Sequence, residues 1–151
     1  MSRALTIRQP WASAIVYAGK DIENRSWRTA WRGRLWIHAA KTHPDRQARK
    51  VYDALDAAQR SHWYMEEPTG AIIGFVELVD IIRDSDSEWA EPGMYHWVLR
   101  EPWFLDGPIQ MRGYQGLWRP EIETGILRAY AYPQKRWASS NVKGTKEDND
   151  E

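Results

Sequence analysis

The sequence predicts an α+β fold in which about six short strands form a mixed sheet that curls into a small β-barrel, with two or more helices beside it. Short apolar stretches of strand periodicity alternate with two stretches of helical periodicity. The length of 151 residues suits one hydrophobic core. We therefore expect a single domain over residues 1–138, followed over 139–151 by a disordered acidic tail that is too poor in apolar residues to fold.

The first 40 residues are expected to form two strands, a helix and an extended segment. Residues 4–8 have the alternation of a strand. Pro10 follows, at the first turn of a helix, where a missing N–H costs little, and Gly19 suits the end of that helix. Residues 20–27 are expected to be extended, and residues 34–40 alternate as a second strand.

A second helix and the central strand are expected next. Pro44 opens the helix, and apolar residues at helical spacing predict that one face of it is buried. Residues 71–82 are apolar on both faces, which is typical of a strand covered on both sides, and Gly74 within them indicates a bulge or a close backbone approach. The helical stripe consists of Ala48, Val51, Tyr52, Leu55 and Ala58.

The remainder of the expected fold contains a loop and two short strands. Residues 84–93 predict a polar, acidic loop, 95–99 a further strand, and 108–118 a short strand followed by a glycine turn. No apolar run approaches the roughly 20 residues that cross a membrane, so we expect no membrane partner.

Cysteine usage and missing motifs exclude several kinds of chemistry. The chain has no cysteine, which rules out disulfides and thiolate zinc sites, and we expect a cytoplasmic protein. It lacks the phosphate loop, the dinucleotide-binding glycine motif, the serine-hydrolase elbow and the zinc-protease helix motif. His38 and His43 lie five residues apart without an evident third ligand, so we expect neither a metal nor a cofactor.

Basic charge is concentrated at the start of the chain, although the total balances at 21 basic and 21 acidic residues. Residues 1–50 hold 11 basic and 3 acidic side chains, a net charge of +8, whereas 51–145 carry −5 and 146–151 carry −3. A concentrated positive field attracts phosphates, and chance segregation of solvated charge is the alternative. Ten Trp and seven Tyr against two Phe favour half-hydrated stacking surfaces.

Residues 25–36, RSWRTAWRGRLW, interleave arginine with tryptophan. Single-stranded nucleic acid binding uses this combination, because arginine neutralises phosphates and aromatic faces stack bases. The alternative is that Trp27 and Trp36 belong to the packing of the barrel and that the arginines cover them. We expect Trp36 in the core, since Leu35 and Ile37 flank it in a strand.

An acid and two bases follow the first helix directly, at Lys20, Glu23 and Arg25. In an extended segment Glu23 and Arg25 point to the same face, so we expect an ion pair that fixes the guanidinium at a cleft. Lys20 also suits the negative end of the helix dipole, which accounts for the lysine without any function.

Four sequence blocks, in this order, resemble the ASCH domain, the activating signal cointegrator homology family of the PUA-like superfamily. They are TIRQPWASAIVYAGKDIENRSW, RGRLWIHAAK, GAIIGFVELVD and PIQMRGYQGLW. The resemblance covers residues 4–118 and implies a PUA-like small β-barrel with a cleft beside the first helix. The family pattern GxKxxExR falls on Lys20, Glu23 and Arg25, with Ala18 at its leading glycine.

The resemblance implies a module that binds RNA or single-stranded nucleic acid in a basic, Trp-lined cleft, and we expect a monomer. The alternative is a small hydrolase, either a ribonuclease or an amidohydrolase acting on acetylated cytidine, with Lys20 and Glu23 as the catalytic candidates. Amidohydrolases of the superfamily use a Lys, Thr and Glu set, and here Glu23 stands where the threonine would be. The expected binding residues are Arg8, Gln9, Trp11, Lys20, Arg25, Ser26, Trp27, Arg28, Arg32 and His38.

Overall fold

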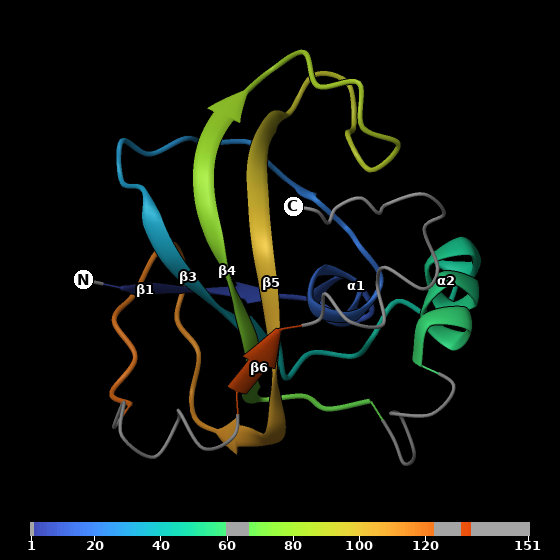
Figure 1. Ribbon diagram of the computed structural model, residues 1–151, viewed down its shortest axis with the longest axis vertical. Helices are drawn as coiled ribbons and strands as arrows, with labels where there is room; N and C mark the ends of the chain where they lie inside the picture. The colour runs from blue at the N-terminus through green and yellow to red at the C-terminus, as the bar shows by residue number, and fades with distance from the viewer. Residues whose placement is uncertain (1, 60–66, 123–130, 134–151) are drawn as a thin grey trace, which may run out of the picture.

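The computed structural model describes residues 2–59, 67–122 and 131–133 (Figure 1). The predicted acidic tail over 139–151 lies outside these residues, and so does the predicted end of the domain at residue 138. The side chain of Ala58, the last member of the predicted helical stripe, is also outside the described part.

The described chain contains two helices and six strands. The prediction of a small mixed sheet with flanking helices is therefore confirmed. The helices are α1 (Trp11–Tyr17) and α2 (Arg49–Gln59). The strands are β1 (Arg3–Ile7), β2 (Ile22–Arg25), β3 (Gly33–Ala39), β4 (Ala71–Ile82), β5 (Tyr95–Gln110) and β6 (Ala131–Pro133).

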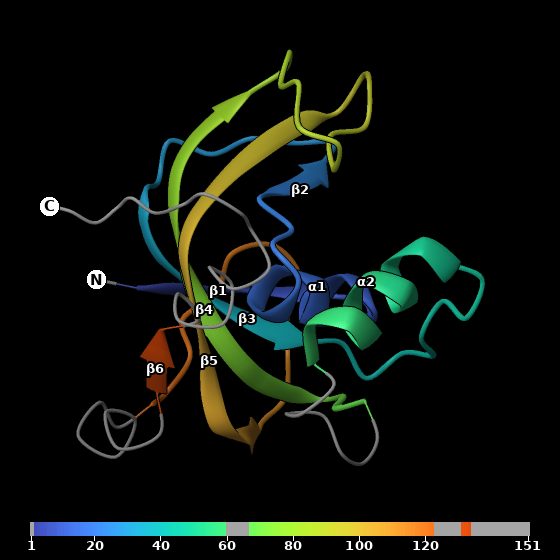
Figure 2. The same cartoon turned by 45° about the vertical axis from the view of Figure 1, so that its right-hand side comes forward.

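These strands form one mixed sheet with the order β1-β3-β4-β5-β2, and β6 pairs with β5. β1 runs parallel to β3, and the other pairs are antiparallel. Figure 2 shows that β4 and β5 curve strongly, so that the sheet forms part of a barrel with both helices on its concave side. A backbone bridge between Ala4 and Trp118 returns the chain after β5 to the free edge of β1.

β4 occupies the centre of the sheet, as predicted, and both β5 and α1 approach it closely at Gly74. The pairing with β5 shifts register beside Gly74. A Cβ atom at this position would lie 2.2 Å from the carbonyl oxygen of Trp103 on β5 and 2.7 Å from Cγ1 of Val16 on α1. Only a glycine leaves room for both neighbours.

β5 differs from the prediction, because the two expected strands over 95–99 and from residue 108 are parts of one strand of 16 residues. Pro102 and Pro108 each lie where the pairing with β4 shifts register. A bulge leaves a residue unpaired, so a proline without an N–H donor is accommodated there without ending the strand. Glu101, with a φ of 54°, lies in the first of these bulges.

Helix α1 fills the concave side of the sheet. Its residues from Ala12 to Val16 are all buried, and Ile15 and Val16 join a core that includes Trp97 of β5. Gly19 follows the helix with a φ of 76°, in the left-handed region, so its predicted role at the end of the helix is confirmed.

Helix α2 begins at Arg49, five residues after the proline expected to open it. Asp45 accounts for the difference, since its carboxylate accepts the N–H of Gln47 and its carbonyl accepts the N–H of Ala48 in a local turn. The predicted stripe is confirmed in part. Val51 and Leu55 are buried against Ala14 of α1, and Ala48 and Tyr52 border this cluster.

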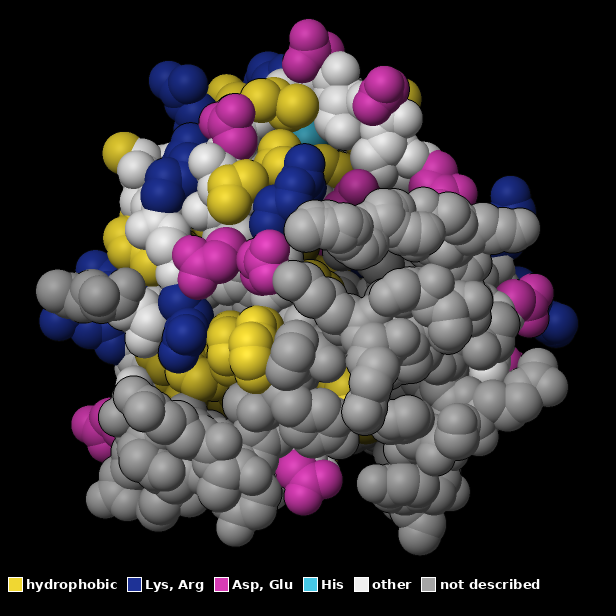
Figure 3. All heavy atoms as spheres, viewed as in Figure 1, with side chains coloured by type: hydrophobic (Ala, Val, Ile, Leu, Met, Phe, Trp, Pro, Cys, Tyr) yellow, Lys and Arg dark blue, Asp and Glu magenta, His cyan; other side chains and the backbone are white. Residues whose placement is uncertain are grey.

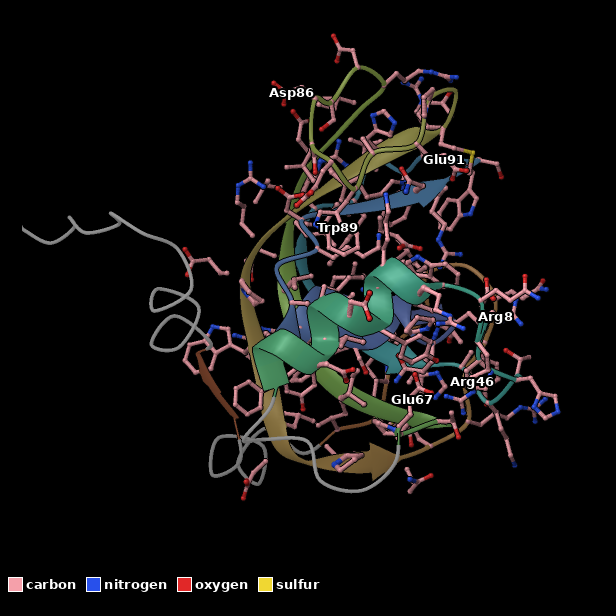
Figure 4. The ribbon with its side chains drawn as sticks, turned by 90° about the vertical axis from the view of Figure 1, so that its right-hand side faces the viewer. Arg8, Arg46, Glu67, Asp86, Trp89 and Glu91 are labelled. Carbon is pink, nitrogen blue, oxygen red and sulfur yellow. The ribbon has the colours of Figure 1, made fainter. Side chains whose placement is uncertain are left out.

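The chain leading into β4 is tied to α2 by a polar contact. Tyr52 donates its hydroxyl to the carboxylate of Glu67 at 2.9 Å. Arg46 pairs with the same carboxylate at 3.0 Å, and Figure 4 shows these two residues near each other. Burial, followed by the adjacent Glu67, raises the pKa of Tyr52 to about 12. The hydroxyl therefore keeps its proton and remains a donor at neutral pH.

A second apolar cluster lies on the other side of the sheet from the main core. Trp36 is 3 % exposed there and meets Phe75 edge to face, with ring centroids 4.8 Å apart. The prediction that Trp36 is a core residue is confirmed.

In the part of the chain that the structure describes, no helix has the length and apolar character needed to span a membrane.

Replacing Gly74 with alanine should destabilise the protein, because the new methyl group overlaps the β5 backbone and Val16. We expect the free energy of unfolding to fall by about 1–3 kcal/mol, the usual cost of overpacking a core. Urea denaturation followed by tryptophan fluorescence measures the change. Gly107→Ala is the control, since a Cβ there would meet no surrounding atom within 4 Å, and equal losses in the two variants would contradict this packing.

Candidate functional site

Two adjoining hollows open beside the ends of β1, β2 and β3, and both are bordered by Thr6, Arg25 and Ala40. The first hollow, of about 700 Å³, lies between these strand ends and the loop over residues 84–93. The second, of about 1090 Å³, lies between them and the segment over residues 110–116. We call the two hollows together the groove.

The predicted ion pair lies in the wall of the groove and includes a third partner. One carboxylate oxygen of Glu23 accepts a hydrogen bond from Nε of Arg25 at 3.0 Å. The other accepts one from Nζ of Lys20 at 3.2 Å. Arg25 also donates from Nη2 to the carbonyl oxygen of Thr6 at 3.1 Å. Two positions apart on β2, Glu23 and Arg25 face the same side, as the extended segment predicts.

Lys20, expected among the binding residues, is a buried cation. It is 3 % exposed, and its ammonium donates to the carbonyl oxygen of Ile22 as well as to Glu23. A ring from the 84–93 loop, Trp89, lies 5.9 Å from the ammonium. A buried ammonium must be paired to be tolerated, so Lys20 and Glu23 hold each other in place.

The loop over 84–93 forms the outer wall of the first hollow and is fastened by Asn24. The Asn24 side chain donates to the carbonyl oxygen of Trp89 at 3.0 Å and accepts the N–H of Glu91 at 2.9 Å. In Figure 4, Trp89 extends from this loop toward the helices. Glu91, from the same loop, and Arg8 both lie toward the right of that view.

His96 on β5 holds the same loop from behind. It is 2 % exposed, donates from Nε2 to the carbonyl oxygen of Glu91 and accepts the N–H of Ser85 on Nδ1. The acceptor role at Nδ1 requires a neutral ring. The predicted acidic loop is thus an ordered wall, fixed by contacts that no periodicity reveals.

His38 lines the second hollow and is 2 % exposed. Its Nε2 faces the carbonyl oxygen of Met111 at 2.8 Å and therefore carries the proton, which makes Nδ1 the acceptor for the Thr6 hydroxyl at 3.2 Å. Trp118 donates its indole N–H to the same hydroxyl oxygen at 3.1 Å. Burial lowers the pKa of His38, which keeps the ring neutral and this chain of hydrogen bonds intact.

The arginine and tryptophan run divides between different parts of the surface. Arg25 and Trp27 line the groove, whereas Arg32 is exposed and pairs with Asp80 of β4 at 3.7 Å. Trp27 also packs edge to face on Trp97, so the packing interpretation is confirmed for it, and its role in binding stays a prediction. Neither hollow is lined by Ser26, Arg28 or Arg32, all of which are exposed.

The remaining predicted residues are split between the groove and the interior. Arg8 and Trp11 line the first hollow, and Arg8 donates to the carbonyl oxygen of His43. Gln9 is fully buried, with its amide bonded to Ser13 and to the carbonyl oxygen of Pro68. Gln9 therefore supports the start of α1 and presents no surface to a ligand, which corrects its placement among the binding residues.

Four cationic or aromatic residues of the groove are not among the predicted binding residues: Lys41, Trp89, Arg112 and Tyr114. Arg112 and Tyr114 lie in the segment predicted only as a glycine turn. A signal was present there, because a cation and an aromatic residue flank Gly113. A Cβ at Gly113 would lie 2.5 Å from Cε1 of His38, so this glycine lets the segment pass directly over the histidine.

Charge on the face seen in Figure 3 is mixed rather than uniformly basic, with Lys and Arg side chains next to Asp and Glu around apolar patches. The net charge of the first 50 residues therefore does not produce a single basic surface on this face. Among the described residues no group of three His, Asp or Glu side chains is placed to hold a metal ion.

The curled sheet, the two helices on its concave side and the groove beside α1 define a small α+β domain of the PUA-like kind. Residues 5–115 match the family model of the ASCH domain. The chain belongs to the ASCH domain family.

Two curated relatives are similar to this chain over 125 residues. They are activating signal cointegrator 1 of Homo sapiens, at 37 % identity, and activating signal cointegrator 1 of Mus musculus, at 27 % identity. Each match covers 76 % of this chain and 22 % of the relative. The chain thus spans about a fifth of the length of these relatives.

The lowered pKa of His38 predicts a specific pH dependence of stability. As the pH falls below about 6.5, the unfolded chain gains a proton on this ring that the folded protein resists, so the free energy of unfolding decreases. Urea denaturation at pH values from about 7 to 5 should show this decrease in the wild type and a smaller one in His38→Gln. His43→Gln, which changes an exposed histidine, should behave like the wild type, and identical pH profiles for all three proteins would contradict the assignment.

Proposed function

We propose that this protein is a nucleic-acid-binding module that receives single-stranded RNA or DNA in the groove. The observation that carries the proposal is the placement of Arg25, which borders both hollows and is fixed from behind by Glu23 and by the Thr6 carbonyl. A phosphate between the two hollows meets a guanidinium that is already oriented. Binding of the phosphate then costs little side-chain entropy, because the arginine is not ordered anew.

Arg25 keeps donors available for such a phosphate. A guanidinium has five N–H groups, of which Nε serves Glu23 and one on Nη2 serves Thr6. The side chain is 24 % exposed, in contrast to the 2 % of Lys20. Arg25 is therefore the member of the ion cluster that can reach a ligand in the groove.

Charge and aromatic surface along the groove match the same ligand. Arg8 lies at the first hollow, and Lys41 and Arg112 lie at the second, so cations occur on either side of Arg25. Trp11 and Trp27, both half-buried, add aromatic surface. Cations that follow a backbone, together with rings that accept bases, are the general features of single-strand binding.

The ion cluster favours binding over the hydrolase alternative. A catalytic lysine acts as a base or nucleophile through a neutral amine directed at the substrate. Lys20 instead donates to Ile22 and to the carboxylate of Glu23, and Glu23 is occupied on both oxygens. This supports the interpretation that both residues position the guanidinium of Arg25.

The proposal predicts salt-sensitive binding that depends on Arg25. Fluorescence anisotropy with a labelled single-stranded RNA should show binding that weakens as salt rises, because phosphate contacts release counterions. Arg25→Ala should weaken binding about fivefold or more and lower the salt slope by about one. Arg32→Ala is the matched control, being an arginine of the same run that lies outside the groove, and it should change affinity far less.

Two results would contradict the proposal. One is an absence of binding to any oligonucleotide at low salt by folded wild-type protein. The other is an equal loss of affinity in Arg25→Ala and Arg32→Ala, which would indicate attraction to basic charge in general rather than binding in the groove. Thermal melting of each variant shows whether the fold is retained, since Arg25→Ala leaves Glu23 with one partner fewer.

A further inference from the structure

Tyr114 has an unusual combination of exposure and rigid support. Its side chain is 53 % exposed, and among the described residues only Val79 is another exposed large hydrophobic residue. An aromatic side chain that is more than half exposed, at the rim of a hollow of about 1090 Å³, is a feature of binding surfaces.

Two contacts hold the Tyr114 ring in place. Its centroid lies 5.4 Å from that of Trp118 at an interplanar angle of 67°, and the guanidinium of Arg112 lies 5.2 Å from it. Trp118 is itself fixed, since it is 9 % exposed and its indole N–H donates to Thr6. The backbone of Trp118 is paired in both directions with Ala4 of β1. The ring is therefore anchored to the sheet.

The backbone around Tyr114 is fixed as well. Gly113 on one side packs against His38 with no room for a Cβ, and Gly116 has a φ of 69°, a left-handed conformation that other residues rarely adopt. An aromatic side chain on a rigid support loses little entropy when a ligand covers it.

We propose that Tyr114 is the platform on which a base of the bound strand stacks in the second hollow, while Arg25 contacts the adjoining phosphate. This rests on the proposed function and adds to it the ligand class of the second hollow, an unpaired nucleobase. A base within a duplex has both faces covered by its neighbours, so the platform selects single strands or strand ends. Recognition through a ring face tolerates all four bases.

The experiment measures the affinity of the full chain for two labelled probes of equal length. One is a single-stranded RNA, and the other is a strand of abasic sugar-phosphate units, which has the charge but no base to stack. For the RNA we expect Tyr114→Ala to weaken binding about tenfold, Tyr114→Leu to weaken it nearly as much, and Tyr114→Trp to keep it. For the abasic strand, all three variants should bind like the wild type.

Two controls separate stacking from charge and from general surface effects. Val79→Ala removes the other exposed hydrophobic side chain and should leave both affinities unchanged. Lys41→Ala should weaken both probes alike and reduce the salt slope, because it removes a charge that lines the second hollow rather than a base contact. Tyr114→Ala should leave the salt slope as it is in the wild type.

The outcomes distinguish this inference from the proposed function. If the wild type binds RNA and Tyr114→Ala binds it equally well, the platform is refuted and the groove proposal stands. Equal weakening of both probes by Tyr114→Ala would also refute stacking, since the abasic strand has nothing to stack. If the folded wild type binds neither probe at low salt, both proposals fail together.

Discussion

The carboxylate of Glu23 is the contact on which the groove depends. It joins Lys20, from the end of α1, to Arg25 on β2, and Arg25 in turn reaches the Thr6 carbonyl on β1. One buried anion thus ties together a helix end and two strands that are not neighbours in the sheet. Burying such a cluster costs desolvation energy, and a hydrophobic replacement is often as stable. What the cluster supplies here is an arginine held at a defined position in an open groove.

The second half of the groove depends on neutral hydrogen bonds rather than on charge. β5 continues through its bulges to Gln110, and the chain after it returns along β1, where Trp118 and His38 meet at the hydroxyl of Thr6. Thr6 therefore serves both halves, its carbonyl receiving Arg25 and its hydroxyl lying between His38 and Trp118. The ion cluster of Glu23 and the neutral hydrogen bonds of His38 and Trp118 therefore meet at Thr6, and this contact places Arg25 at the junction of the two hollows.

Periodicity predicts the elements of this fold better than it predicts their ends. The apolar run of β4 and its Gly74 determine the central strand, since both are local signals. The prediction divides β5 into two strands, because the bulges that keep it continuous arise from its pairing with β4. The prediction also starts α2 too early, because a local turn at Asp45 replaces the first turn of the helix. Within the site, the spacing of Glu23 and Arg25 predicts their ion pair. The burial of Lys20, Gln9 and His38 is not predictable, since it depends on the folded chain around them, including distant partners such as Pro68 and Met111.

The most direct test of this account is the effect of Glu23→Gln on RNA affinity, measured with and without Arg25→Ala, on variants shown to be folded. Removal of a negative charge beside the groove should by itself strengthen binding to phosphates. If Glu23 positions Arg25, however, Glu23→Gln weakens RNA binding when Arg25 is present, and it no longer does so in the Arg25→Ala background. The coupling between the two substitutions reports the positioning. Tighter binding by Glu23→Gln, of the same size in both backgrounds, would show that Glu23 acts only as a repulsive charge and would contradict the account.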